Sequence, residues 1–333
     1  MSDKQTGNSS LSSVGEAAAA GFDRPLLLTP RQDLMGFITS LAGRAYLTAV
    51  ASVTILTVLL IFVFIIAKAS AFFGERSLWE LIGSKNWFPT HEESAEFGAL
   101  SMFYGTGVVT LGAMLIAMPV GILAAVCLSD IVPFRVRQII KPVVELLAAI
   151  PSVAFGFFAA LVVAPWLQQN WGLDSGTNAL NGSLILAFMA VHTIVSISED
   201  ALTAVGRDLR EGAYALGCTR AEVLCKVVIP AAHSGIIAAV VLGVMRAVGE
   251  TMAVWMATGM SAQVPTPWWN VTAMVRTLTA TIAQEMGEAP DGSVHRHALF
   301  AIGLMLLVLT FLLNLVSEYF LSKAKRLARG KAK

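Results

Sequence analysis

Six stretches of about 20 apolar residues, nearly free of charge, dominate this chain of 333 residues. A helix needs about 20 such residues to cross the hydrocarbon core of a bilayer. Only 14% of the residues are charged, whereas a soluble domain carries about a quarter, so a soluble globular protein is nearly excluded. We therefore predict an all-α integral membrane protein with six transmembrane helices, at 45–67, 99–128, 146–167, 179–198, 234–259 and 298–317.

Lysine and arginine are distributed unevenly between the segments that join these helices. Seventeen of the 23 lie in the N-terminal segment 1–44, the loops 129–142 and 199–233, and the basic tail 319–333, and only five lie in the alternate loops. Because cytoplasmic loops carry the excess of positive charge, we expect both termini to be cytoplasmic. Residues 1–44 are expected to be partly disordered, with a helix at 30–43 that either lies on the inner membrane surface or extends the first span.

Charge and cysteine content exclude several classes of function. A net charge of +1 excludes a nucleic-acid binder that works through bulk positive charge. The three cysteines, Cys127, Cys218 and Cys225, match no zinc spacing, and no histidine cluster accompanies them. We therefore expect neither a disulfide framework nor a metal site. The first 28 residues lack the apolar core of a secretory signal, so we expect the spans themselves to direct insertion.

The loop 199–233 is too long for a simple turn, and its sequence predicts two helices. Residues 206–216 have a helical pattern, and Gly217 suits the left-handed position that ends a helix. Thr219–Glu222 has the form of a capping box that begins a second helix, which we expect Pro230 to stop or kink. A helix-turn-helix DNA reader would need a basic surface, but this loop has five acids and four bases, so we expect a protein-docking element.

This loop resembles the EAA loop of ABC importer permeases, in which Glu-Ala-Ala, Gly and Pro recur at fixed spacings. The matching residues are Glu211, Gly212, Ala213, Gly217, Ile229 and Pro230. The sequence departs from the family pattern at Gly212, Val227 and Ile229. The resemblance implies a coupling helix that docks on an ATPase subunit. The residues implied in this contact are Arg210, Glu211, Gly212, Ala213, Gly217 and Pro230.

This sequence contains no Gly-x4-Gly-Lys-Ser/Thr phosphate loop, which agrees with ATP hydrolysis by a separate subunit. We expect ATP and Mg to be bound by the partner ATPase, and we expect this chain to hold no cofactor of its own. The chain is therefore expected to be a transport subunit rather than an enzyme.

Further stretches are similar to phosphate importer permeases of the PstC type. They are 97–100, 104–106, 145–152, 214–219 and 246–253. The resemblance covers roughly residues 45–320 and implies a type I importer (MetI-like) permease fold for the transmembrane domain 45–318, together with translocation of inorganic phosphate. The implied partners are a second permease subunit of the PstA type, two ATPase subunits of the PstB type, an extracytoplasmic phosphate-binding protein of the PstS type, and membrane lipid. The PstA type is also the main confusable identity.

Two charges, Arg246 and Glu250, fall inside the predicted fifth span. Each isolated charge costs about 2.5–3.5 kcal/mol at a helix centre, and residues four apart on one helix share a face. The two either form a structural ion pair or line the translocation path. We favour the path, because arginine offers paired donors to an oxyanion and a carboxylate can accept the proton that phosphate retains and sulfate lacks. Thr251 can add a hydroxyl group there, and in the resembling family Arg246 and Glu250 match positions that are associated with transport.

Three alternatives remain open. The same machine could carry another oxyanion, molybdate or sulfate, which the phosphate-permease-like stretches disfavour. An ion-coupled secondary transporter or channel would need charged residues in several spans, whereas this chain concentrates them in one. A signalling role, in which the subunit reports phosphate status to a membrane kinase, is compatible with transport.

Overall fold

The computed structural model describes residues 30–89 and 95–330. The expected disorder of the N-terminal segment concerns residues 1–29, which lie outside these ranges. The chain divides into two compact units, Met1–Val63 and Phe64–Lys333. The second unit contains the last five spans and all parts of the candidate site.

Six helices in the described ranges are long and apolar enough to cross a membrane, which confirms the predicted number. They are Thr39–Glu75, Leu100–Ile131, Ser152–Trp171, Ala179–Thr203, Arg220–Gly249 and Val294–Tyr319. The all-α class is also confirmed, since the only strands in the same ranges are the paired two-residue strands β1 (Trp87–Phe88) and β2 (Glu96–Phe97).

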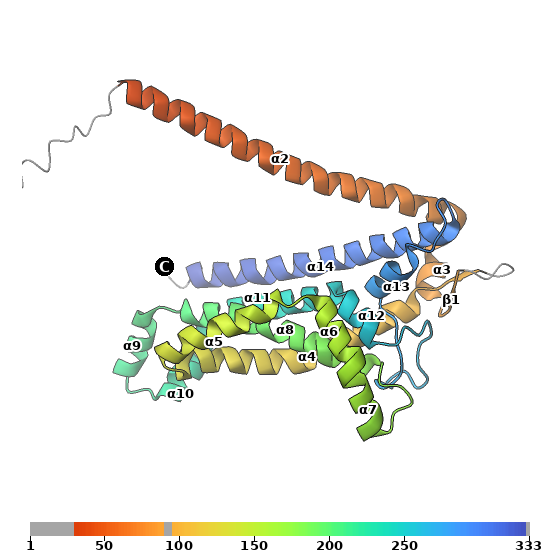
Figure 1. The fold of residues 1–333 in the computed structure, drawn as a ribbon. Coiled ribbons are helices and arrows are strands. Elements are labelled where there is room, and N and C mark those ends of the chain that lie inside the picture. The colour runs from red at the N-terminus through yellow and green to blue at the C-terminus, as the bar shows by residue number, and fades with distance from the viewer. Residues whose placement is uncertain (1–29, 90–94, 331–333) are drawn as a thin grey trace, which may run out of the picture. The chain divides into compact units, whose positions relative to one another are not determined.

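Figure 1 shows the order of the helices along the chain. They are α2 (Pro30–Glu75), α3 (Leu78–Gly83), α4 (Leu100–Val126), α5 (Phe134–Leu146), α6 (Ser152–Phe158), α7 (Ala164–Trp171), α8 (Ala179–Thr203), α9 (Arg207–Ala215), α10 (Arg220–Val223), α11 (Ile229–Gly249), α12 (Met252–Ala257), α13 (Leu278–Glu285) and α14 (Val294–Gly330). Wider π-helical turns follow α4 (η1, Cys127–Ile131), α6 (η3, Ala159–Val163) and α10 (η4, Leu224–Val228), and a 3-10 turn follows α5 (η2, Leu147–Ala149).

All six spans differ from the predicted limits at one end or both, and the third and fifth differ because the helix is interrupted. The third begins at Ser152 rather than 146, because Pro151 has an extended backbone (ψ 137°) and the chain before it forms the separate helix α5. The fifth begins at Arg220 and ends at Gly249, because α10, η4 and α11 form one helical run that stops earlier than expected.

The first and last helices extend beyond their apolar stretches. α2 runs without a break from Pro30 to Glu75, so the segment 30–43 continues the first span, which is one of the two arrangements expected. α14 likewise continues into the basic tail as far as Gly330.

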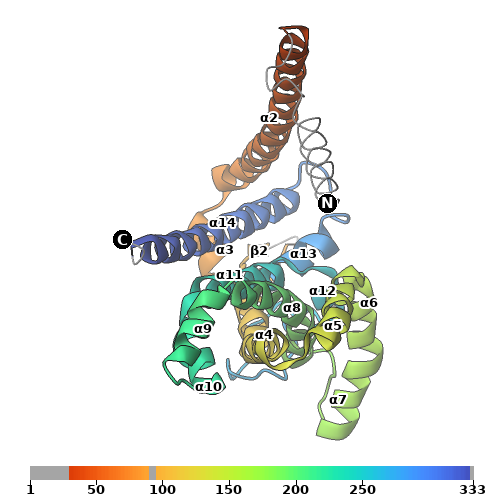
Figure 2. The same cartoon turned by 90° about the vertical axis from the view of Figure 1, so that its left-hand side faces the viewer.

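A bundle of α4, α8 and α11 forms the centre of the second unit, and the three helices lie side by side in both views (Figures 1 and 2). Glycine allows them to approach closely: a Cβ atom on Gly243 of α11 would lie 3.0 Å from Ile194 of α8, and one on Gly121 of α4 would lie 2.7 Å from the same side chain. Between membrane helices, such close packing replaces the hydrophobic drive that water supplies to soluble proteins. The bundle therefore holds its helices in a fixed register.

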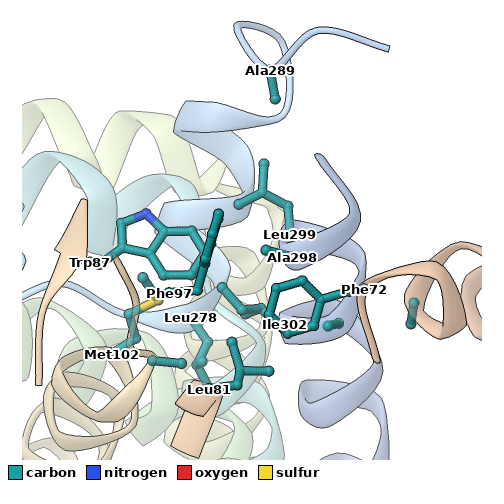
Figure 3. Packing of buried hydrophobic residues seen from close by; sticks show 13 residues of the cluster. Phe72, Leu81, Trp87, Phe97, Met102, Leu278, Ala289, Ala298, Leu299 and Ile302 are labelled. Carbon is teal, nitrogen blue, oxygen red and sulfur yellow. The ribbon is translucent and has the colours of Figure 1, made fainter. Parts of the chain in front are cut away.

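A second apolar core lies at the opposite end of the unit from α9 and α10 (Figure 3). The rings of Trp87 and Phe97 meet edge to face, with centroids 5.9 Å apart. Leu278, Leu299 and Ile302 are buried against them. This core joins the β1–β2 hairpin to α13 and α14.

Candidate functional site

The fifth span is interrupted where the sequence places its two charges. α11 ends at Gly249, Glu250 is extended (φ −72°, ψ 132°), and the chain resumes as α12 at Met252. The prediction of one helix over 234–259, with Arg246 and Glu250 on a shared face, is therefore wrong. The helix stops because other groups take over the hydrogen bonds of its last turn.

The interruption lies level with the middle of α8, which runs antiparallel to α11. Gly243 packs against Ile194 before the interruption, and Thr258 packs against Gly182 after it. Since α8 itself is one of the spans, the interruption is at mid-depth in the bundle. Irregular backbone is tolerated at membrane depth only where protein buries it or where it lines a water-filled cavity.

Side chains near the interruption satisfy its backbone groups. The hydroxyl of Thr279, on α13, donates to the Glu250 carbonyl at 2.7 Å. The Ala253 N–H donates to Glu250 Oε1 at 3.3 Å, and the Thr251 hydroxyl donates to the Gly249 carbonyl at 3.4 Å. Glu250 is thus held as a cap of α12, which explains why it is not the partner of Arg246.

Arg246 lies in the last turn of α11 and is exposed in this chain. It has no hydrogen bond or ion pair with any residue of the described ranges, so the structural ion pair with Glu250 does not form there. An arginine without a carboxylate partner retains all five N–H donors for an anion.

The predicted helices of the loop 199–233 are present. α9 covers Arg207–Ala215, and Gly217 follows in the left-handed region (φ +81°). Thr219 and Glu222 form both hydrogen bonds of the capping box: the Glu222 N–H donates to the Thr219 hydroxyl at 3.4 Å, and the Thr219 N–H donates to the Glu222 carboxylate at 3.0 Å. The sequence reading of this turn is confirmed.

Pro230 does not stop the second helix, which was one of the two outcomes expected. Proline lacks an N–H group, and its ring crowds the carbonyl four residues earlier. Here the wider turn η4 (Leu224–Val228) directly precedes Ile229 and accommodates the proline, and the helical run continues to Gly249. One run therefore joins the Gly217 turn to the interruption beside Arg246.

α9 has two faces with different surroundings. Ala213 is buried in an apolar cluster with Leu202, Val223 and other residues from the ends of α4, α8 and α11. On the other face Glu211 and Gly212 are exposed. The residues that sequence reasoning missed are the exposed apolar side chains Leu209, Tyr214 and Leu216.

Arg210 faces the rest of the chain rather than the exposed side of α9. Its guanidinium pairs with Asp130 in η1, and its Nη2 donates to the Leu202 carbonyl at 2.8 Å. Asp130 was also missed, although it is an acid placed directly after the second apolar stretch. The structure thus assigns Arg210 contacts within this chain, and its predicted role in coupling stays a prediction.

A second charged cluster lies at the same end of the unit. Glu199 of α8 is fully buried (0% exposed) and is paired with Arg137 and Lys141 of α5, the latter at 2.7 Å; Lys141 also contacts Asp200 at 2.6 Å. Among the described residues, no group of three or more His, Cys, Asp or Glu side chains is arranged to hold a metal ion. The cluster therefore joins helices.

Six helices that are long and apolar enough to cross a membrane, one of them interrupted beside Arg246, are typical of a multi-pass membrane transport protein. Residues 117–326 match the family described as "Binding-protein-dependent transport system inner membrane component", and the chain belongs to that family. It is therefore a multi-pass protein of the inner membrane.

Two relatives illustrate the similarity in sequence. The chain is 36% identical over 301 residues to the probable ABC transporter permease protein YqgH of Bacillus subtilis (strain 168), which covers 90% of this chain and 96% of the relative. It is 37% identical over 264 residues to the phosphate transport system permease protein PstC of Mesorhizobium japonicum, which covers 74% of this chain and 79% of the relative.

Solved structures share the fold at low sequence identity. The inward facing MetNI methionine ABC transporter aligns with a TM-score of 0.50 and 18% identity, over 68% of this chain and 94% of that chain. A bacterial alginate ABC transporter, solved with an alginate-bound periplasmic protein, aligns with a TM-score of 0.55 and 18% identity, over 84% and 95%. These alignments confirm the MetI-like permease fold implied by the sequence.

Proposed function

We propose that this chain is the membrane-spanning permease subunit of an ATP-driven importer that moves inorganic phosphate from an extracytoplasmic binding protein to the cytoplasm. The observation that carries the proposal is Arg246, which has no ion pair within the described ranges and lies beside an interrupted helix at mid-depth. Transporters bind substrates where discontinuous helices meet near the midplane. The choice of phosphate is supported by relatives named as phosphate transport permeases, including the one at 37% identity.

The residues at the interruption have distinct proposed roles. Arg246 donates paired, charge-assisted hydrogen bonds to the phosphate oxygens. Glu250 uses Oε1 to cap α12, and its other oxygen, which has no hydrogen-bond donor in the described part of the chain, accepts the proton-bearing P–OH group. Thr251 adds a neighbouring hydroxyl. Sulfate, which carries no proton near neutral pH, meets only repulsion at Glu250.

The exposed face of α9, with Glu211 and Gly212, is the proposed contact with an ATPase subunit that binds ATP and Mg. Gly217 and Pro230 shape the turn and helix behind this face. We expect two ATPase subunits (PstB type), a second permease (PstA type) and a phosphate-binding protein (PstS type). Both termini are then cytoplasmic, on the same side as α9.

The test is reconstitution of the four-part complex in lipid vesicles, with phosphate uptake measured with and without ATP and with sulfate as competitor. We expect ATP-dependent phosphate uptake that excess sulfate does not suppress. Suppression by sulfate or molybdate would indicate another oxyanion, and uptake by this chain without ATPase subunits would indicate a secondary transporter. Either result contradicts the proposal.

A further inference from the structure

Arg210 joins three helices at the α9 end of the unit. It belongs to α9, it pairs with Asp130 in the turn that ends α4, and it donates to the carbonyl of Leu202 in the last turn of α8 at 2.8 Å. That carbonyl otherwise accepts a long bond from the Val205 N–H at 3.4 Å. Carbonyls of a last helical turn lack partners within their own helix, so Arg210 completes the end of α8 from outside.

The second oxygen of Asp130 is occupied as well. The Ser129 hydroxyl donates to Asp130 Oδ2 at 2.5 Å, while Arg210 pairs with Oδ1. The Arg210 and Asp130 side chains are 21% and 15% exposed, so bulk water screens their attraction less than that of a surface pair. The contact is directional, because a guanidinium fork fixes both distance and orientation.

Three other routes connect α9 with the spans. Residues 204–206 link it directly to α8. Ala213 packs into the apolar cluster beneath α9, but a buried methyl group makes no directional contact. The Gly217 turn leads into the helical run that ends beside Arg246. In the described ranges, only the Arg210–Asp130 pair joins α9 to η1, at the end of α4, through charged side chains.

Through α8, the Arg210 contact is also connected to the level of the interruption. Leu202 and Ile194 are eight residues apart on α8, which corresponds to about 12 Å along the helix, and Ile194 packs against Gly243 of α11, three residues before Arg246. A displacement of the end of α8 therefore reaches the same level that the α11 route reaches.

We propose that Arg210 and Asp130 are positioning residues for ATP-driven transport, through which movement of α9 displaces α4 and α8 together with α11. This inference rests on the proposed function. Without the contact, α9 can follow the ATPase while α4 stays behind. ATP hydrolysis then continues and transport fails.

The experiment compares Asp130→Asn with the wild type in the complete complex in vesicles, with ATP hydrolysis and phosphate uptake measured on the same preparation. We expect uptake to fall about tenfold or more while ATP hydrolysis stays within about twofold. A tenfold fall corresponds to about 1.4 kcal/mol on the transport step alone. Asp130→Glu, which retains the charge, should restore most of the uptake.

Arg137→Gln is the matched control. Arg137 is 20% exposed and pairs with a carboxylate at the same end, but it joins α5 to α8 and does not touch α9. Its loss should leave the ratio of phosphate moved to ATP hydrolysed unchanged. Should Asp130→Asn fail to assemble, Arg210→Lys, which retains the charge but not the fork, should lower that ratio severalfold.

The outcomes separate the two proposals. A wild-type complex without ATP-dependent phosphate uptake overturns the proposed function. A wild-type complex that transports, with Asp130→Asn lowering uptake and hydrolysis equally or changing neither, overturns the positioning role alone. An unchanged ratio of phosphate moved to ATP hydrolysed in Arg210→Lys would also overturn the positioning role.

Discussion

Two regions of the second unit place charge in apolar surroundings, and they do so in opposite ways. At the α9 end, Glu199 is fully buried, and its oxygens are held by Arg137, Lys141 and the Thr203 hydroxyl. At mid-depth, Arg246 has no such partner within the described ranges. The first arrangement is complete in itself, whereas the second lacks a counter-charge.

The difference indicates what each region is for. A buried charge whose partners belong to the same chain is stabilised, and removing one partner is strongly destabilising. An unpaired charge at membrane depth costs about 2.5–3.5 kcal/mol and persists where a ligand or another subunit supplies the missing charge. We therefore expect stability to depend on the α9 end and transport to depend on the interruption.

The largest expected effect tests the interruption. Arg246→Gln should lower phosphate uptake by at least about 100-fold, because two charge-assisted hydrogen bonds of about 1.5 kcal/mol each are lost. Assembly should be retained, because Arg246 supports no other group in the described part of the chain. Uptake in vesicles and copurification of all subunits are the measurements. Arg246→Lys, with its single ammonium group, should recover part of the uptake, and a wild-type rate for Arg246→Gln would eliminate the path.

The second prediction tests the α9 end. Glu199→Ala removes the carboxylate that Arg137 pairs with and leaves Lys141 with Asp200 alone, and we expect a loss of about 3 kcal/mol in the free energy of unfolding. The measurement is thermal unfolding of the purified complex in detergent. Uptake per folded complex should remain.

The matched control is Lys226→Gln, which breaks the pair that Lys226 forms with Glu222 at a 70% exposed side chain. Surface pairs contribute little, so the unfolding temperature should hardly change. If Glu199→Ala left the unfolding temperature unchanged and abolished uptake, transport rather than stability would depend on the α9 end.

Local features of both regions could be read from the sequence. The number of spans follows from apolar length alone, and the Gly217 turn with its capping box depends on residues only a few positions apart. The presence of Arg246 in a span was equally visible. These features are determined by neighbours along the chain, so the amino-acid sequence alone is enough to predict them.

The partners of the charges could not be read in the same way. The break after Gly249 depends on the Thr279 hydroxyl, 29 residues from Glu250, which takes over a carbonyl of the helix. Arg210 and Asp130 are 80 residues apart. Such pairings arise only when the bundle forms, and no local pattern around Glu250 distinguishes a broken helix from a continuous one.

The third prediction tests the backbone conformation at the α9 end, independently of its charged side chains. Gly217→Ala should destabilise the turn by about 1 kcal/mol, because an L-residue is strained at φ +81°, and no atom lies within 4 Å of the new Cβ to add a clash. Gly212→Ala, on α9 and equally free of contacts, should stabilise the helix by somewhat less than 1 kcal/mol. Unfolding of the complex in detergent measures both. Equal signs for the two variants would show that the left-handed turn is not maintained.

The smallest expected effect concerns a third charged cluster, which extends the comparison to the end away from α9. Glu285 accepts hydrogen bonds from Trp87 at 2.8 Å and His295 at 2.9 Å, and pairs with Arg276 at 2.5 Å. Burial acts to raise the pKa of Glu285, but the hydrogen bonds from His295 and Trp87 and the charges of Arg276 and His295 outweigh it, so the pKa is lowered.

A lowered pKa in the folded state means that the unfolded state binds the proton more readily. The contribution of Glu285 to stability is therefore complete above the ordinary pKa of glutamic acid, about 4.3, and declines as the pH falls below it through the lowered value. We expect the difference in unfolding temperature between the wild type and Glu285→Gln to shrink as the pH falls over that interval. A difference that does not change below the ordinary pKa would show that these partners do not stabilise the ionised form of Glu285.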